Sequence, residues 1–338
     1  MKHNRQLKHL TYAILAIPTL WITGCNTSPT FNVVQGAVWN TTYNIKYSGE
    51  RNLDDSIMTV INNIELSLSP FNHNSFIARI NDNISMEADS NIIKVMEISH
   101  MVNRLSNKAF DPTVSPLVNL WGFGYEGHED KVPTVNDIAS ALALVGIDSC
   151  HIDSYMIMHK KSPGTTFNFS AVTKGYACDE IGRMLRRNGS TDYMIEIGGE
   201  LTLGGTNDKG VPWRIMIDAP VDNTHGHQRL MTIQLSDCGI ATSGNYRNYH
   251  DTGNHGRVGH TISPSTGYPV TTSTLSATVI APDCATADAL ATACMAMPAD
   301  SALSMIEKYG NTHCLLVIGT PDSMTLVSTP LFPAGNVQ

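Results

Sequence analysis

The stretch Asn168-Phe-Ser-Ala-Val-Thr-Lys-Gly-Tyr-Ala-Cys-Asp179 organises the prediction of the fold. It opens as an apolar extended run and breaks at Ser170, a residue type that favours helix N-caps. The apolar spacing that follows predicts a helix to Arg187, ended by Asn188-Gly189. A strand that leads into a helix points free backbone N–H groups and carbonyls into one small space. Such a space suits phosphate groups and metal ions.

Lys174 falls in the first turn of this predicted helix. A cation at that end opposes the helix dipole, so its position calls for an explanation. Either the lysine is solvated on an ordinary helix, or it meets an anion. The stretch alone leaves both interpretations open.

The composition limits the classes of partner. The chain has 338 residues, a formal net charge of -8 and only 15% charged residues. This length predicts one large domain or two closely packed ones, with a sizeable core. An acidic chain poor in lysine and arginine argues against nucleic acid as a partner. A phosphate-bearing ligand would therefore need local features, such as a metal ion or helix termini.

The N-terminus has the pattern of a bacterial lipoprotein signal. Basic residues precede a short apolar run at residues 10–20, and small residues lead to Cys25. The run is short for a membrane span. Residues 1–24 are therefore predicted to be removed, Cys25 to carry lipid, and residues 25–36 to form a tether. An uncleaved anchor and ordinary secretion are the alternatives, and Asn26 after the cysteine leaves the choice of membrane open.

The other cysteines are scattered and form no Cys-x-x-Cys pair. This argues against a zinc site and favours small buried side chains, while any disulfide connectivity cannot be read from spacing. They are Cys150, Cys178, Cys238, Cys284, Cys294 and Cys314.

Hydrophobic periodicity predicts helices and strands mixed along the whole chain. The fold class is therefore α+β, as a single unit with two interleaved subdomains. Predicted helices are 53–68, 91–105, 134–144, 285–297 and 299–309, with 222–228 as a loop. Predicted strands are 37–47, 193–197, 201–203, 213–217, 230–235, 239–242, 275–281, 314–318 and 324–328, the last two as a hairpin. The stretch Phe110–Gly124 is too apolar for an exposed loop, and predicts a short helix and loop lining an interior cleft.

Asp288 and Thr292 lie four residues apart near the start of a predicted helix, so their oxygens share one face. A carboxylate and a hydroxyl, completed by carbonyls and waters, suit Mg²⁺. The plainer interpretation is that the aspartate serves the helix dipole and the threonine bonds back to its own helix.

His260 stands before a predicted turn in a segment rich in Gly, Ser and Thr. It suits a general base, because the histidine pKa is near neutrality, but a structural histidine fits the same pattern. Two other patterns are rejected. The Gly198-Gly199 pair does not open a helix as a dinucleotide-binding fingerprint requires, and His225 and His227 lack carboxylate partners at metal-ligand spacing.

Several segments, each only moderately specific, occur in a fixed order along the chain. They are Phe110–Gly124, Ser170–Tyr176 with Asp179, Glu196–Gly199, Thr242–Tyr249, His260–Pro269, Thr278–Ala281 and Ala287–Thr292. Together they resemble the ApbE family of FAD:protein FMN transferases, which are magnesium-dependent periplasmic lipoproteins. The resemblance covers nearly the whole mature chain, and its strength lies in the order of the segments.

This resemblance implies a T-fold-related transferase domain at residues 37–330, followed by a tail at 331–338. It also implies a reaction. A threonine hydroxyl of an acceptor protein attacks the flavin-side phosphorus of FAD, AMP leaves, and FMN stays on the acceptor as a phosphodiester. Mg²⁺ would neutralise and orient the pyrophosphate, which offsets the shortage of cationic residues.

The resemblance also implies residue roles, carried over by position. Asp288, Thr292 and the Ala171 carbonyl would bind magnesium, with Ala291 at a further ligand position where it offers only its carbonyl. Asp111 would hold the adenosine part of FAD, Lys174 would lie at the dinucleotide, and His260 would act on the acceptor threonine. The positions that would contact or line the flavin nucleotide site are Trp39, Ser69, Pro70, Phe71 and Ile262.

The chain departs from the family pattern at three places. Asn168 replaces the usual aspartate of the central motif, Ser263-Pro264 replaces an Asp-Pro, and Val38–Thr41 replaces an early Thr-Met-Gly-Thr. Loss of the two carboxylates would alter loop anchoring or the surroundings of the metal.

Two other functions remain as alternatives. One is an FAD pyrophosphatase, in which water replaces the acceptor threonine, and the other is a non-catalytic flavin-binding lipoprotein. For the transferase, family analogy suggests an acceptor subunit of an NADH:quinone reductase or a related electron-transfer protein. It places the lipid-anchored enzyme at the periplasmic face of the inner membrane, with the outer membrane as the alternative.

Overall fold

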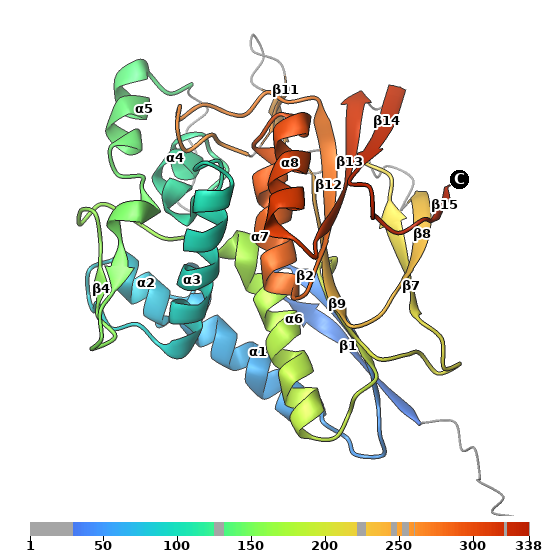
Figure 1. Cartoon of the computed structure of the whole chain (residues 1–338). Helices are drawn as coiled ribbons and strands as arrows, with labels where there is room; N and C mark the ends of the chain where they lie inside the picture. The colour runs from blue at the N-terminus through green and yellow to red at the C-terminus, as the bar shows by residue number, and fades with distance from the viewer. Residues whose placement is uncertain are drawn as a thin grey trace, which may run out of the picture.

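The computed structural model describes residues 30–124, 132–221, 228–244, 249–251, 257–259, 261–320 and 323–337. An eight-stranded antiparallel sheet, in the order β1-β2-β5-β6-β9-β12-β13-β14, forms its centre. Helices cover one face of this sheet, and a small sheet in the order β15-β8-β7 lies toward the other (Figure 1). The predicted α+β class is confirmed.

The elements follow one another in mixed order. The helices are α1 (Asp54–Leu68), α2 (Phe76–Asn81), α3 (Ser90–Leu105), η1 (Pro112–Val114), α4 (Ser115–Leu120), α5 (Val135–Leu142), η2 (Ile147–Ser149), α6 (Ser170–Arg187), α7 (Cys284–Met295) and α8 (Ala299–Tyr309). The strands are β1 (Phe31–Val38), β2 (Thr41–Ser48), β3 (His151–Ile152), β4 (Met158–His159), β5 (Tyr193–Ile197), β6 (Glu200–Gly204), β7 (Trp213–Asp218), β8 (Arg229–Leu235), β9 (Cys238–Gly244), β10 (Tyr249–Asp251), β11 (Arg257–Gly259), β12 (Thr274–Ala281), β13 (His313–Thr320), β14 (Ser323–Ser328) and β15 (Asn336–Val337).

The alternation of side chains along β12 and β13 explains why the sheet has a hydrophobic core on each face. Val279 and Leu316 belong to the main core on the helix side. Their neighbours Ile280 and Leu315 belong to a second core with the β7 and β8 side chains. Because successive residues of a strand point to opposite faces, the sheet is buried on both sides at β12 and β13.

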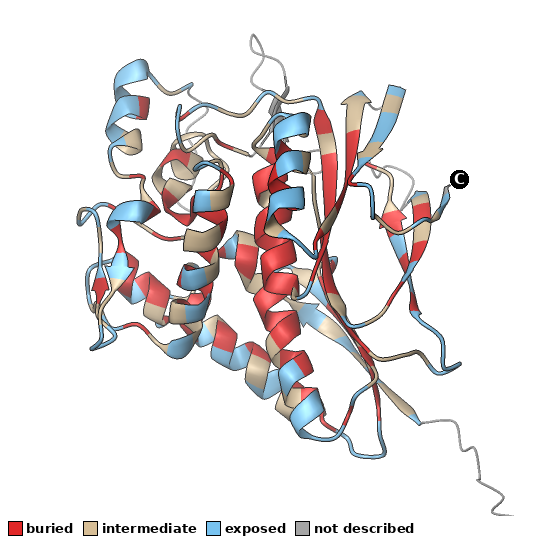
Figure 2. Ribbon diagram, in the orientation of Figure 1, coloured by how far each residue is buried: buried red, intermediate tan, exposed pale blue. Residues whose placement is uncertain are grey.

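Helix α7 occupies the middle of the helix layer and is buried along nearly its whole length (Figure 2). Its alanines allow close packing against α6 and the sheet. Where α6 crosses α7, a Cβ on Gly175 would lie 2.4 Å from the Cys284 carbonyl oxygen. Small residues at this crossing therefore bring the second turn of α6 close to the first turn of α7.

Most predicted elements are confirmed, with each end within two residues of the observed one, and the predicted C-terminal hairpin is β13–β14. The predicted strand 37–47 is wrong, because a tight turn divides it into β1 and β2. Trp39 and Asn40 form this turn with φ of 49° and 58°. Ser170 is the first helical residue of α6 rather than its N-cap, which is Phe169.

The predicted domain bounds need correction at both ends. Strand β1 begins at Phe31, inside the predicted tether. Near the other end, Asn336–Val337 pairs with β8, so the predicted tail 331–338 contributes a strand. Among the described residues, no helix is both long and apolar enough to cross a membrane. Cys25 and the predicted signal lie outside the described residues, as does the predicted 222–228 loop except for Gln228.

Candidate active site

Two cavities adjoin the first turn of α6. The first, of about 580 Å³, lies between the β1–β2 turn and α1, and is called the hairpin cavity. The second, of about 480 Å³, lies beside α7 and is called the α7 cavity. Ser170 and Lys174 line both of them. Each volume is in the range of small-molecule sites, so their shared wall offers room for a ligand with two ends.

The residues predicted to contact the flavin nucleotide do not all line the same cavity. Trp39 and the segment Ser69-Pro70-Phe71 line the hairpin cavity. Ile262 lines the α7 cavity, where it also belongs to a small core with α4 and α5. The apolar stretch 110–124 contributes η1 and α4 to the wall of the α7 cavity, which confirms the predicted helix and cleft.

Lys174 pairs with Glu200, with Nζ 2.5 Å from Oε1. Burial acts to lower the pKa of Lys174, but the charges of Glu200 and Asp288 outweigh this and raise it. Burial raises the pKa of Glu200, and Lys174 opposes that rise. The anion that meets this lysine is therefore supplied by the first residue of β6. Sequence reasoning missed Glu200, because nothing local links the start of a strand to a helix 26 residues earlier.

Asp288 reaches the same place from α7. Its Oδ2 accepts a hydrogen bond of 3.2 Å from the Gly175 N–H. In a regular helix that N–H pairs with the carbonyl four residues earlier, which is that of Ala171. The Ala171 carbonyl therefore shares its donor with a carboxylate. Ala171, Asp288 and Thr292 all line the α7 cavity.

The side chains around Asp288 fit a hard cation. Asp288 is 3% exposed, and burial raises its pKa while Lys174 lowers it. Thr292 adds a hydroxyl, 3.3 Å from that of Ser243. Within the described residues, no group of three or more His, Cys, Asp or Glu side chains is suited to hold a metal. One carboxylate with neutral oxygens suits Mg²⁺, which is commonly completed by water and substrate phosphates.

Two other predicted site residues, Asp111 and Ala291, make contacts that stabilise the fold. Asp111 lines the α7 cavity, yet its carboxylate accepts hydrogen bonds from Thr113 and from the Ile147 N–H at 3.1 Å. Its visible role is to hold η1 against η2. Ala291 is fully buried in the main core and is not among the described residues that line the α7 cavity. His260 lies outside the described residues.

Asn168 remains at the site although it is not a carboxylate. Its Oδ1 accepts hydrogen bonds from the Ser170 N–H at 3.0 Å and from the Ser170 hydroxyl at 2.5 Å. Asn168 also lines the α7 cavity. An amide oxygen can accept both of these bonds, so the entry into α6 is held without the aspartate usual in the family.

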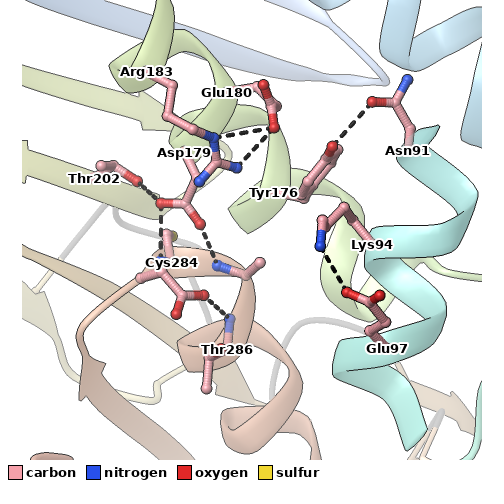
Figure 3. A network of polar contacts seen from close by, with 12 residues as sticks. Asn91, Lys94, Glu97, Tyr176, Asp179, Glu180, Arg183, Thr202, Cys284 and Thr286 are labelled. Carbon is pink, nitrogen blue, oxygen red and sulfur yellow. Dashed lines mark hydrogen bonds and ion pairs between the residues drawn. The ribbon is translucent and has the colours of Figure 1, made fainter. Parts of the chain in front are cut away.

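A second network fixes α7 relative to α6 (Figure 3). Asp179 is 5% exposed and accepts hydrogen bonds from the N–H groups of Cys284 and Ala285, at 3.0 and 2.9 Å. It also accepts one from the Thr202 hydroxyl at 2.7 Å. A carboxylate of α6 thus satisfies the free N-terminal donors of α7, four residues before Asp288. The role of Asp179 was not predicted, because its backbone partners on α7 are over 100 residues away in sequence.

The buried carboxyl group of Asp179 should make the stability of the fold depend on pH. Burial raises its pKa from the ordinary 3.8 to about 6, against the effect of its hydrogen bonds. The folded state therefore binds this proton more tightly than the unfolded state does. The contribution to the free energy of unfolding is greatest below the ordinary pKa and falls by roughly 3 kcal/mol as the pH rises through the folded pKa.

Urea unfolding of the wild type and of Asp179→Asn at about pH 4 and about pH 7 measures this contribution. The asparagine variant lacks the titration and loses an acceptor, so it should be less stable throughout. The stability advantage of the wild type should shrink at the higher pH. A constant difference across this range would exclude the proposed titration.

Comparison with known proteins decides the family. The sequence profile described as the ApbE family matches residues 39–316. The chain belongs to the ApbE family. It is 32% identical to the FAD:protein FMN transferase of Haemophilus influenzae, over 96% of this chain and 98% of that protein. It is 34% identical to the FAD:protein FMN transferase of Vibrio cholerae, over 90% of this chain and 92% of that protein.

Solved ApbE structures agree with this fold. The flavin transferase ApbE from Vibrio cholerae superposes with a TM-score of 0.79 at 31% identity, over 89% of this chain and 98% of that one. The Pseudomonas stutzeri flavinyl transferase ApbE in its apo form gives a TM-score of 0.80 at 28% identity, over 89% and 95% of the two chains. The arrangement of sheet and helices is therefore that of the ApbE family.

Proposed function

We propose that this chain is an FAD:protein FMN transferase that requires Mg²⁺. The observation that carries the proposal is the meeting of Lys174, Asp288 and Thr292 beside two adjoining cavities, in an ApbE-family chain. A dinucleotide has two ends and a central pyrophosphate. The shared wall at Ser170 and Lys174 matches that shape.

The residues of this chain have distinct roles in the proposed reaction. Lys174 offers a positive charge at the pyrophosphate while Glu200 holds its ammonium group. Asp288, Thr292 and the Ala171 carbonyl would hold Mg²⁺, which when bound supplies charge neutralisation to the pyrophosphate.

The proposed chemistry is a single displacement at phosphorus. The oxygen of the acceptor threonine forms a bond to the flavin-side phosphorus, and the bond from that phosphorus to the AMP oxygen breaks. His260 takes the hydroxyl proton or positions the hydroxyl. This role rests on the sequence resemblance, and normal FMN transfer by His260→Ala at saturating FAD and acceptor would exclude it.

The cellular setting is part of the proposal. The N-terminal pattern supports lipidation at Cys25 and attachment to a membrane on its periplasmic side. The acceptor would be an envelope-facing flavoprotein subunit of an NADH:quinone reductase or a related electron-transfer protein. Mass spectrometry of candidate acceptors coexpressed with this chain would detect the mass of added FMN.

A reaction with FAD, Mg²⁺ and an acceptor tests the activity. The expected result is AMP release matched by covalent FMN on the acceptor, and loss of both when Mg²⁺ is chelated. Free FMN with or without acceptor would instead indicate an FAD pyrophosphatase. Bound FAD without AMP release under any condition would indicate a flavin-binding protein.

A further inference from the structure

Two charged residues oppose the dipoles of their helices, and both line the hairpin cavity. Lys174 lies at the start of α6 and Glu65 in the last turn of α1. A carboxylate at a helix C-terminus is unfavourable, and α1, which is described in full, has no basic residue in its last turn. The ion pair with Glu200 explains the position of Lys174. The position of Glu65 must be explained by a different hydrogen-bond partner.

That partner is the indole of Trp39. Its Nε1 donates a hydrogen bond to Glu65 Oε2 at 2.6 Å, a short distance typical of a charged acceptor. Trp39 is also a non-glycine residue with φ of 49° in the β1–β2 turn. Such a backbone conformation is unfavourable for a large residue and persists where surrounding contacts fix it. The turn therefore fixes the backbone of Trp39, and the Glu65 carboxylate fixes its indole.

We propose that Glu65 is a positioning residue that fixes the indole of Trp39 as a wall for a planar heteroaromatic ring. The ring would be one of the two carried by FAD, so the inference rests on the proposed function. Both residues line the same cavity, and an indole offers a large flat surface for stacking with little loss of side-chain freedom. Fixing the indole before binding would increase affinity, because less freedom is lost when the ring docks.

Equilibrium titration of the full chain with FAD, followed by flavin and tryptophan fluorescence, tests the role of Glu65. Glu65→Ala should weaken FAD binding about tenfold, since the indole loses its acceptor. Glu65→Gln keeps a carbonyl oxygen for the indole N–H and should bind FAD within about threefold of the wild type. Asp55→Ala removes an exposed carboxylate of the same helix and should leave the affinity unchanged.

A double-mutant cycle separates positioning from general stability. In a Trp39→Phe background, Glu65→Ala should have no further effect on FAD affinity, because the phenyl ring that replaces the indole has no N–H to orient. A full additional loss in that background would overturn the inference. So would a Glu65→Gln variant as weak as Glu65→Ala. Thermal unfolding of each variant identifies one that fails to fold, and Glu65→Gln then carries the test because it is nearly isosteric.

Titration with FMN and with AMP identifies which ring of FAD lies against Trp39. The loss of affinity caused by Glu65→Ala should appear with one of these ligands and not with the other. An equal loss with both, or with neither, would overturn the inference. Failure of the wild type to bind FAD at all would instead contradict the proposed function, so the two outcomes are distinguishable.

Discussion

Asp288→Ala is expected to reduce FMN transfer and AMP release by on the order of 100-fold or more, the largest effect on activity predicted for this chain. Asp288 is the carboxylate that α7 brings to the α7 cavity, beside Thr292 and Lys174. Without it the cavity retains neutral oxygens for a cation, together with the carboxylates of Asp111 and Glu200, which already have partners. The loss should be partly reversed by raising the Mg²⁺ concentration if binding of the ion is the step affected.

The control is Asp300→Ala, which removes an exposed carboxylate from the first turn of the neighbouring helix α8. It should leave the rate within about twofold, as expected for a surface substitution. Initial rates of AMP release across a Mg²⁺ titration measure both variants. A normal rate for Asp288→Ala in limiting Mg²⁺ would refute the proposed role of the carboxylate.

The sequence allowed the local parts of this site to be predicted. Periodicity located α1, α6 and α7, and four-residue spacing placed Asp288 and Thr292 on one face. The position of Lys174 against its helix dipole left two interpretations open, and the structure agrees with the one in which the lysine meets an anion, Glu200. These inferences depend on neighbours along the chain, where geometry follows from secondary structure alone.

The partners could not be predicted, because they depend on tertiary contacts. Glu200 and Asp179 look like ordinary charged residues until β6 and α7 pack against α6. The β1–β2 turn was missed for a different reason. Trp39 and Asn40 adopt positive φ without a glycine, so the usual sequence signal of a turn is absent. The sequence pattern therefore predicted one continuous strand instead of two.

Gly175→Ala is expected to destabilise the fold by about 3 kcal/mol, because its methyl group would overlap backbone atoms at the α6–α7 crossing. The added Cβ would lie 2.4 Å from the Cys284 carbonyl oxygen and 2.9 Å from the Ala285 Cα. Backbone atoms at the start of α7 cannot move without shifting the donors that Asp179 accepts from. The same shift would draw Asp288 away from the Gly175 N–H, so FMN transfer should fall as well.

Gly182→Ala is the matched control in the same helix. Its Cβ would meet the Tyr193 ring and hydroxyl at 3.1 to 3.3 Å, which are longer contacts than those at Gly175 and involve side-chain rather than backbone atoms. Alanine also favours a helix over glycine by about 1 kcal/mol, which offsets the closer contact. Urea unfolding of the two variants therefore separates helix propensity from helix packing. Equal stabilities would mean that the crossing tolerates a methyl group, and that close packing at Gly175 is not what holds Asp288 beside Lys174.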